Sequence, residues 1–152
     1  MPKGMSELDH LKTDLVFLLL LEIEKITSLP IRRDRLQQVM PFYIMFLALA
    51  GVKDLMFFRD AVLDIYRDLD DYMVYLREMG FVRIDPGDRA RVNLIPRAIH
   101  QFKQSLKMDH EQKELVTKAA HLAASVYIQD VSFEEIVRET HYFSRSFSSA
   151  AS

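Results

Sequence analysis

The spacing of apolar and polar residues predicts a mostly helical chain with one β-hairpin near its centre. From Arg59 to Gly80, apolar residues recur every three or four positions, which is typical of a helix with one buried face. These apolar residues are Val62, Ile65, Tyr66, Leu69, Tyr72, Met73, Leu76 and Met79. Gly80 is expected to end this helix, because glycine readily adopts the positive φ common at helix C-termini.

Two short alternating runs follow the predicted helix, at residues 81–84 and 89–95, and the turn Asp85-Pro86-Gly87-Asp88 separates them. Proline presets one turn dihedral and glycine tolerates positive φ, so this pattern predicts a hairpin. A glycine-ended helix followed at once by a hairpin is typical of the recognition helix and wing of a winged helix. The predicted fold is therefore mostly α, with a winged helix-turn-helix core, one β-hairpin wing and extra N- and C-terminal helices.

The N-terminal helix is expected to begin at a capping box of Ser6 and Asp9 and to reach about Thr27. Between Leu15 and Leu21 it is apolar nearly all round, so it needs neighbours on more than one side. These neighbours are either the rest of this chain or a second copy, and the second option predicts a homodimer through the apolar N-terminal helices.

A second helix is predicted from about residues 32–34 to Ala50, with Gly51 as its stop. Pro41 lies inside it and is expected to kink or break the helix near residues 39–40, because proline removes a backbone hydrogen bond. The methionine- and phenylalanine-rich residues between 40 and 58 suit either a core or a partner interface.

The remaining elements are predicted from shorter signals. Residues 55–58 are expected to form a short strand or turn against the wing. Helices are expected over 97–106, from Asp109 to about residue 127, and after a capping box at Ser132. The domain is expected to span residues 1–143 as one unit, followed by a flexible serine-rich tail, 144–152.

Composition narrows the function classes. The chain has 152 residues, a formal net charge of −2 and no cysteine, which excludes disulfides, thiolate catalysis and cysteine-based metal sites. The N-terminus lacks the layout of a secretion signal, and the apolar run 15–21 is far shorter than a bilayer span. We therefore expect a cytoplasmic protein that does not interact with membranes.

Three segments resemble, in the same order, the small winged-helix proteins of the YwgA type, which are related to the antitoxin-like SocA/Panacea proteins. The first is the basic Arg-Leu-Gln helix start at residues 33–39, and the second is the acidic helix 69–82, closed by Met79-Gly80-Phe81-Val82. The third is the segment 131–142, placed like the family's C-terminal helix. The resemblance implies a regulatory or partner-binding module that has no catalytic residues.

The predicted helix 59–80 is acidic, with three basic and six acidic residues and a net charge of −3. Asp64, Asp68 and Asp71 fall on one helical face, next to Arg67. Such a face repels phosphate, so Asp64, Arg67, Asp68 and Asp71 are predicted to contact a protein partner.

The segment 81–107 is basic instead, with six basic and two acidic residues and a net charge of +4. Its arginines, with those near residue 35, are candidates for contacts along a phosphate backbone. The predicted nucleic-acid-binding residues are Arg35, Arg83, Arg89, Arg91 and Lys103. The alternative is ordinary solvated charge with salt bridges to the acidic helix.

No motif announces catalysis or a cofactor. The five histidines are scattered, the four glycines are isolated, and no Gly-x-Ser-x-Gly elbow occurs. We therefore expect no enzyme, no metal and no cofactor. The predicted function is a non-catalytic winged-helix module acting through protein–protein interaction in regulation, as an antitoxin-like protein or an adaptor. The alternative is a dimeric DNA-binding transcriptional regulator that contacts duplex DNA through the phosphate backbone.

Overall fold

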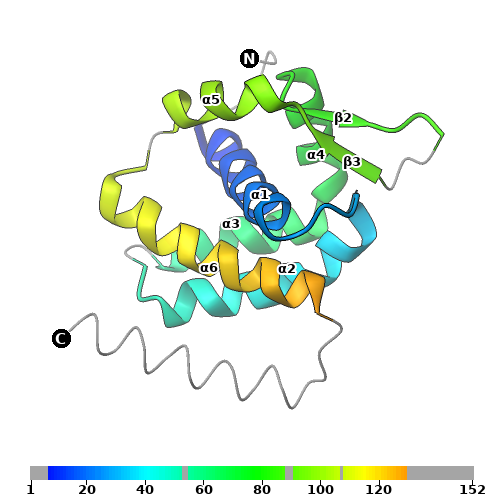
Figure 1. The fold of residues 1–152 in the computed structure, drawn as a ribbon. Coiled ribbons are helices and arrows are strands. Elements are labelled where there is room, and N and C mark those ends of the chain that lie inside the picture. Colours follow the sequence, from blue (N-terminus) through cyan, green and yellow to red (C-terminus); the bar gives the residue numbers. More distant parts are fainter. Residues whose placement is uncertain (1–6, 53–54, 88–90, 107, 130–152) are drawn as a thin grey trace.

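A computed structural model of the chain describes residues 7–52, 55–87, 91–106 and 108–129 (Figure 1). The fold is mostly α, as predicted, with a small three-stranded antiparallel sheet. The helices are α1 (Glu7–Ile26), α2 (Arg33–Leu49), α3 (Leu55–Arg67), α4 (Leu69–Glu78), α5 (Pro96–Ser105) and α6 (His110–Ile128), and the strands are β1 (Ile31–Arg32), β2 (Val82–Ile84) and β3 (Arg91–Leu94).

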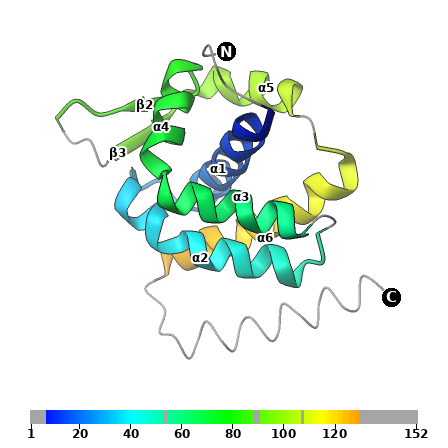
Figure 2. The same ribbon diagram turned by 180° about the vertical axis from the view of Figure 1, so that it is seen from behind.

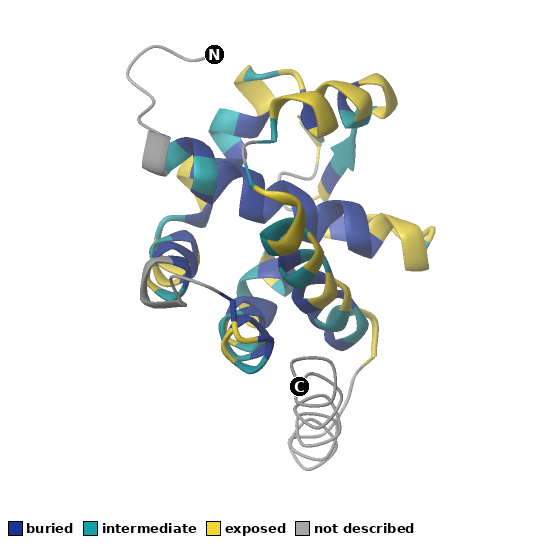
Figure 3. Ribbon diagram, turned by 90° about the vertical axis from the view of Figure 1, so that its left-hand side faces the viewer, coloured by how far each residue is buried: buried dark blue, intermediate teal, exposed yellow. Residues whose placement is uncertain are grey.

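Helix α1 lies in the middle of the molecule, with the other helices arranged around it (Figures 1 and 2). All residues from Leu15 to Leu21 are buried, and α1 packs against α6, α3 and α4. Buried residues gather toward this centre and exposed residues lie outside (Figure 3). The neighbours that the apolar helix requires therefore come from the same chain, and residues 15–21 are not available for the predicted homodimer contact.

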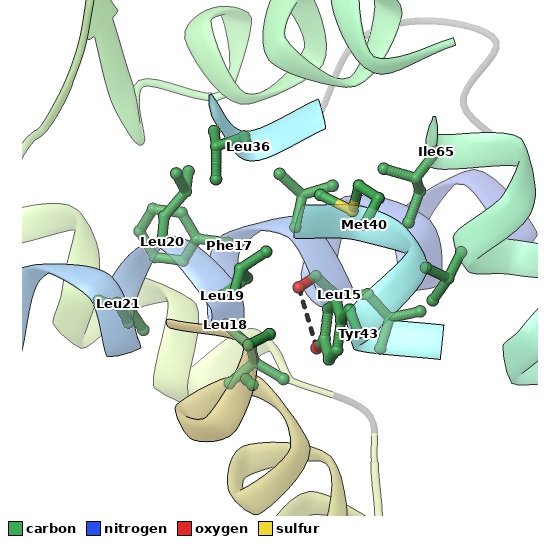
Figure 4. Close-up of a cluster of buried hydrophobic side chains, with 14 of the residues drawn as sticks. Leu15, Phe17, Leu18, Leu19, Leu20, Leu21, Leu36, Met40, Tyr43 and Ile65 are labelled. Carbon is green, nitrogen blue, oxygen red and sulfur yellow. Dashed lines mark hydrogen bonds between the residues drawn. The ribbon is translucent and has the colours of Figure 1, made fainter. Parts of the chain in front are cut away.

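Aromatic residues join α1 to the elements on either side. The Tyr43 hydroxyl donates a hydrogen bond to the Leu15 carbonyl at 3.3 Å, which ties α2 to α1 (Figure 4). The Phe17 ring lies 5.1 Å from that of Phe81 and 4.6 Å from that of Phe102, measured between centroids. The core thus links α1 to the start of the hairpin and to α5.

Helix α2 runs without interruption from Arg33 to Leu49, so of the two outcomes predicted near residues 39–40, a kink or a break, the break is wrong. Pro41 itself is exposed, whereas Met40 and Tyr43 are fully buried. Packing of this buried face compensates for the hydrogen bond that the proline cannot make. The predicted stop is confirmed, because Gly51 follows the C-cap with a φ of 67°.

The predicted long helix 59–80 is wrong in its continuity and in its start. Helix α3 begins at Leu55, where a strand or turn had been expected, and ends at Arg67. Asp68 breaks the helix with φ −116° and ψ 33°, and α4 follows. Aspartate is unfavourable in helix interiors, although the Asp68 side chain makes no capping hydrogen bond to α4. The break lets α3 pack on α2 while α4 packs on β2. Tyr66, predicted to be buried, is 42% exposed.

The predicted hairpin is confirmed. Gly80 ends α4 with a φ of 79°, and β2 pairs antiparallel with β3, Val82 opposite Leu94. Strand β1, which the sequence pattern did not indicate, pairs with the other side of β3 and gives the strand order β1-β3-β2. Ile31 and Val92 are buried on the inner face of this sheet.

The last two helices also match the prediction. Pro96 is the first residue of α5, and the Asp109 side chain caps α6 by accepting a hydrogen bond from the Gln112 amide at 2.8 Å. The capping boxes at Ser6 and Ser132, the boundary at residue 143 and the tail 144–152 lie outside the described residues. None of the described helices combines the length and the apolar composition needed to cross a membrane.

Candidate functional site

The acidic residues at the end of α3 are held in an internal ion-pair network. Asp64 accepts a hydrogen bond from Lys12 Nζ at 2.8 Å and from Arg67 Nη2 at 2.9 Å. Lys12 comes from α1, and its side chain is 8% exposed. Arg67 also pairs with Asp68, with Nε 3.3 Å from Oδ2. The structure therefore brings together Asp64, Arg67 and Asp68, but it pairs them with one another and with Lys12 of α1.

The protonation of this network follows from its contacts. The hydrogen bond from Lys12 lowers the pKa of Asp64 despite the opposing effect of burial. Burial disfavours the ammonium of Lys12, but the hydrogen bond to Asp64 and the nearby Tyr72 and Asp64 outweigh it and raise the pKa of Lys12. Both groups are therefore charged at neutral pH.

Helix α4 presents the other carboxylates at its first turn. Asp70 pairs with Arg33 of α2, with 3.0 Å between Oδ1 and Nη1, and Asp71 is exposed. Because Asp68 interrupts the helix, Asp64, Asp68 and Asp71 do not form the continuous acidic face that the sequence predicts. Asp71 is the member of that set that remains exposed without an ion pair to another described residue.

A cleft of about 660 Å³ separates α4 from the inner face of the hairpin, and we name it the α4–hairpin cleft. Its apolar wall includes Met73 and Val74 of α4 and Ile84 of β2. Arg77 and the Arg33–Asp70 ion pair add charges of both signs to the lining. Sequence reasoning missed this cleft, because its two walls meet only in the folded chain.

The basic residues of the sheet share its outer face. The register places Arg32 opposite Arg91 and Arg83 opposite Asn93, and alternation along β3 puts residues 91 and 93 on the same side. Arg32, Arg83 and Arg91 thus lie on three adjacent strands, and we name them the basic sheet face. Arg32 pairs with Asp34 at 3.4 Å, whereas Arg83 and Arg91 form no ion pair with any other described residue.

The other predicted nucleic-acid contacts lie elsewhere. The Arg35 guanidinium donates to the Tyr127 carbonyl at 3.1 Å and to the Gln129 carbonyl at 3.2 Å, and so caps the C-terminal end of α6. Lys103 is exposed in the last turn of α5, which leads away from the hairpin (Figure 1). Arg89 lies outside the described residues.

Among the described residues, no group of three or more histidines, aspartates and glutamates has the arrangement of a metal site. The chain matches no family model, no curated protein and no solved structure. The functional interpretation therefore depends on the α4–hairpin cleft and the basic sheet face.

Proposed function

We propose that this chain is a non-catalytic regulatory module of the winged-helix type, antitoxin-like or an adaptor, that binds a partner protein in the α4–hairpin cleft. The order of the elements and the strand order β1-β3-β2 support a winged-helix arrangement. In that arrangement, α4 has the position of the recognition helix and the hairpin β2–β3 is the wing.

The observation that carries the proposal is the chemistry of the α4–hairpin cleft. Its apolar wall and its charges of both signs suit a protein segment that inserts an apolar side chain and pairs its polar groups at the rim. The exposed charges of α4 are Asp70, Asp71, Arg77 and Glu78, a net of −2, which disfavours insertion of this helix into a DNA groove.

Affinity capture with the full-length protein as bait tests this proposal. Arg77→Glu reverses an exposed charge in the cleft lining, and Lys103→Glu makes the same change on α5 as a matched control. We expect a partner protein that is retained by wild type and by Lys103→Glu and lost with Arg77→Glu. If wild type retains nothing above bare resin, or if both variants behave alike, the cleft is not the binding site.

A second candidate function, a DNA-binding regulator, is favoured by one observation. The basic sheet face sets three arginines across adjacent strands, where they could follow a phosphate backbone. Titration of generic duplex DNA at low and moderate salt tests it. Affinity should fall steeply with salt, and Arg83→Ala with Arg91→Ala should flatten the slope by about two ion equivalents. Absence of binding at low salt would eliminate this candidate.

A further inference from the structure

Exposed apolar side chains gather where α1 and α6 end. Five large apolar residues are exposed in the described part of the chain, namely Ile26, Leu29, Leu63, Tyr66 and Ile128. Ile26 and Leu29 lie at the end of α1 and just beyond it, and Ile128 is the last residue of α6. Leu29 is the most exposed of the five, at 73%. Ile26, Leu29 and Ile128 thus form one exposed apolar cluster, whereas Leu63 and Tyr66 lie on α3.

Leu29 and Ile128 line a groove of about 550 Å³, which we name the Leu29 groove. Leu29, Pro30 and Ile128 line it with apolar surface. Its charged lining residues are Arg32, Asp34, Arg35 and Arg91, a net charge of +2, and Asp34 pairs with Arg32 at 3.4 Å. Its walls are fixed to each other, because the Arg32 amide donates a hydrogen bond to the Tyr127 hydroxyl at 2.8 Å. The groove is therefore a preformed apolar surface with a basic border.

The chain itself supplies a segment of matching chemistry. Residues 131–143 follow α6, which ends at Ile128, and contain three acidic residues and one basic residue, a net charge of −2. Phe133, Ile136 and Val137 have the spacing of one apolar helical stripe. Phe133 follows Ile128 by five residues, a reach of at most about 18 Å, so the groove is within range of the segment.

We propose that residues 131–143 bind back into the Leu29 groove of the same chain, with Phe133 against Leu29 and the carboxylates of Glu134 and Glu135 toward Arg91. The burial of Leu29 and the opposite charges of segment and groove favour this contact. Because Arg91 also belongs to the basic sheet face, the bound segment competes with any acidic ligand of that face. This inference is independent of the proposed partner site in the α4–hairpin cleft, whose lining shares no residue with the Leu29 groove.

The absence of cysteine from the chain allows a direct test in the full-length protein. Ser28→Cys and Ser132→Cys place one thiol next to Leu29 and one next to Phe133, and both apolar residues stay native. The effective concentration of the two thiols is then measured in a glutathione redox buffer, and non-reducing electrophoresis separates disulfides within a chain from disulfides between chains.

Variants of this double-cysteine protein distinguish binding of residues 131–143 in the Leu29 groove from proximity that comes only from the covalent connection to α6. If residues 131–143 dock, Leu29→Asp and Arg91→Glu should each lower the effective concentration about tenfold, whereas Lys103→Glu, the same charge change on α5, should leave it unchanged. An effective concentration that Leu29→Asp does not alter would mean that the tether alone brings the thiols together, and the proposal would fail. Disulfides formed chiefly between chains would assign the groove to a second copy and would also overturn it. Far-UV circular dichroism confirms that each variant is folded.

Discussion

The Lys12–Asp64 pair shows how this fold places a charge close to its core. Lys12 projects from a helix whose following residues are almost all apolar, and its ammonium lies 2.8 Å from the Asp64 carboxylate. An unpaired ammonium in such surroundings costs several kcal/mol, and a paired one costs much less. The pair therefore fixes the position of the end of α3 against α1.

Asp64→Asn should lower the free energy of unfolding by about 1–3 kcal/mol at neutral pH, because Lys12 loses its counter-charge while Asp64 is itself partly exposed. Urea unfolding measures this change. Asp60→Asn is the matched control, since Asp60 is exposed on the same helix and pairs with Arg59 at 3.6 Å on the surface. Equal effects of the two substitutions would contradict a stabilising role of the Lys12–Asp64 pair.

The pH dependence of the same pair has a defined sign. The pKa of Asp64 is lower in the folded chain than in the unfolded chain, so its stabilisation is complete above the ordinary aspartate pKa and is lost as the pH falls through the lowered value. The difference in stability between wild type and Asp64→Asn should thus be constant from about pH 5 to 8 and shrink below about pH 4. Urea titrations at pH 3, 5 and 7 check this; a difference that grew at low pH would be inconsistent with it.

Among the elements, α2 contains an unfavourable backbone position, a proline in its interior. Pro41 lies in its interior and lacks the amide hydrogen that would complete the helix, yet the helix continues to Leu49. The end of α6 depends on a contact from α2, because its terminal carbonyls accept hydrogen bonds from Arg35. Helix α2 is thus weakened locally at Pro41, whereas the end of α6 is stabilised by Arg35, a residue distant in sequence.

Pro41→Ala should raise the free energy of unfolding by about 1–2 kcal/mol, since an exposed alanine restores the backbone hydrogen bond and only part of the gain is offset in the unfolded chain. Thermal unfolding measures the effect. Pro96→Ala serves as the control, because Pro96 is the first residue of α5, where the missing amide hydrogen carries no penalty. A Pro41→Ala protein no more stable than wild type would refute this account of α2.

Arg35→Ala should cost about 1–2 kcal/mol, because the carbonyls of Tyr127 and Gln129 lose a charged donor at the negative end of the α6 dipole. Arg35→Lys should recover part of this loss, since an ammonium keeps the charge but not the forked geometry. Chemical denaturation of the three proteins checks the order. If alanine and lysine were equivalent to arginine, the observed hydrogen bonds would contribute nothing to stability.

At the scale of the whole molecule, α6 packs closely against both α1 and α2. The side of α6 that packs against them carries the fully buried residues Ala119, Ala120, Ala123 and Ala124. Alanine lets helix axes approach more closely than larger side chains do, so this side leaves no room for added volume.

Ala123→Leu should destabilise the protein by about 1–3 kcal/mol, because the added carbons must displace close-packed neighbours. Ala48→Leu adds the same atoms to an exposed position of α2 and should change stability little. Thermal unfolding of both variants provides the comparison. A tolerated leucine at position 123 would show that the packing of α6 is looser than the structure describes.

Local signals predicted most of the elements, and contacts distant in sequence explain most of the errors. Gly80 and the Pro86-Gly87 turn each act within a few residues, so the end of α4 and the hairpin could be predicted from the sequence. The apolar spacing continues unchanged across Asp68, so the break there was not predictable from the pattern. Strand β1 has two residues, and its partner β3 lies about sixty positions later in the chain.

The candidate site was harder to predict for the same reason. Arg35 was predicted to contact phosphate because it lies near other arginines in the sequence, but its partners are carbonyls more than ninety residues away. Asp64 was assigned to an exposed face, and its partner Lys12 lies fifty-two residues earlier. The sequence shows where charged residues lie along the chain. Only the tertiary structure shows which of them are already paired within the chain and which are free to contact a ligand.

The hydrogen bond from the Arg32 amide to the Tyr127 hydroxyl has a consequence for self-association. Strand β1 is one edge of the sheet, and an outward amide there is a site where a strand from another molecule can add. The tyrosine occupies this donor and so blocks growth of the sheet into intermolecular ribbons at β1. A strand added at this edge would therefore have to displace the Tyr127 hydroxyl from the Arg32 amide.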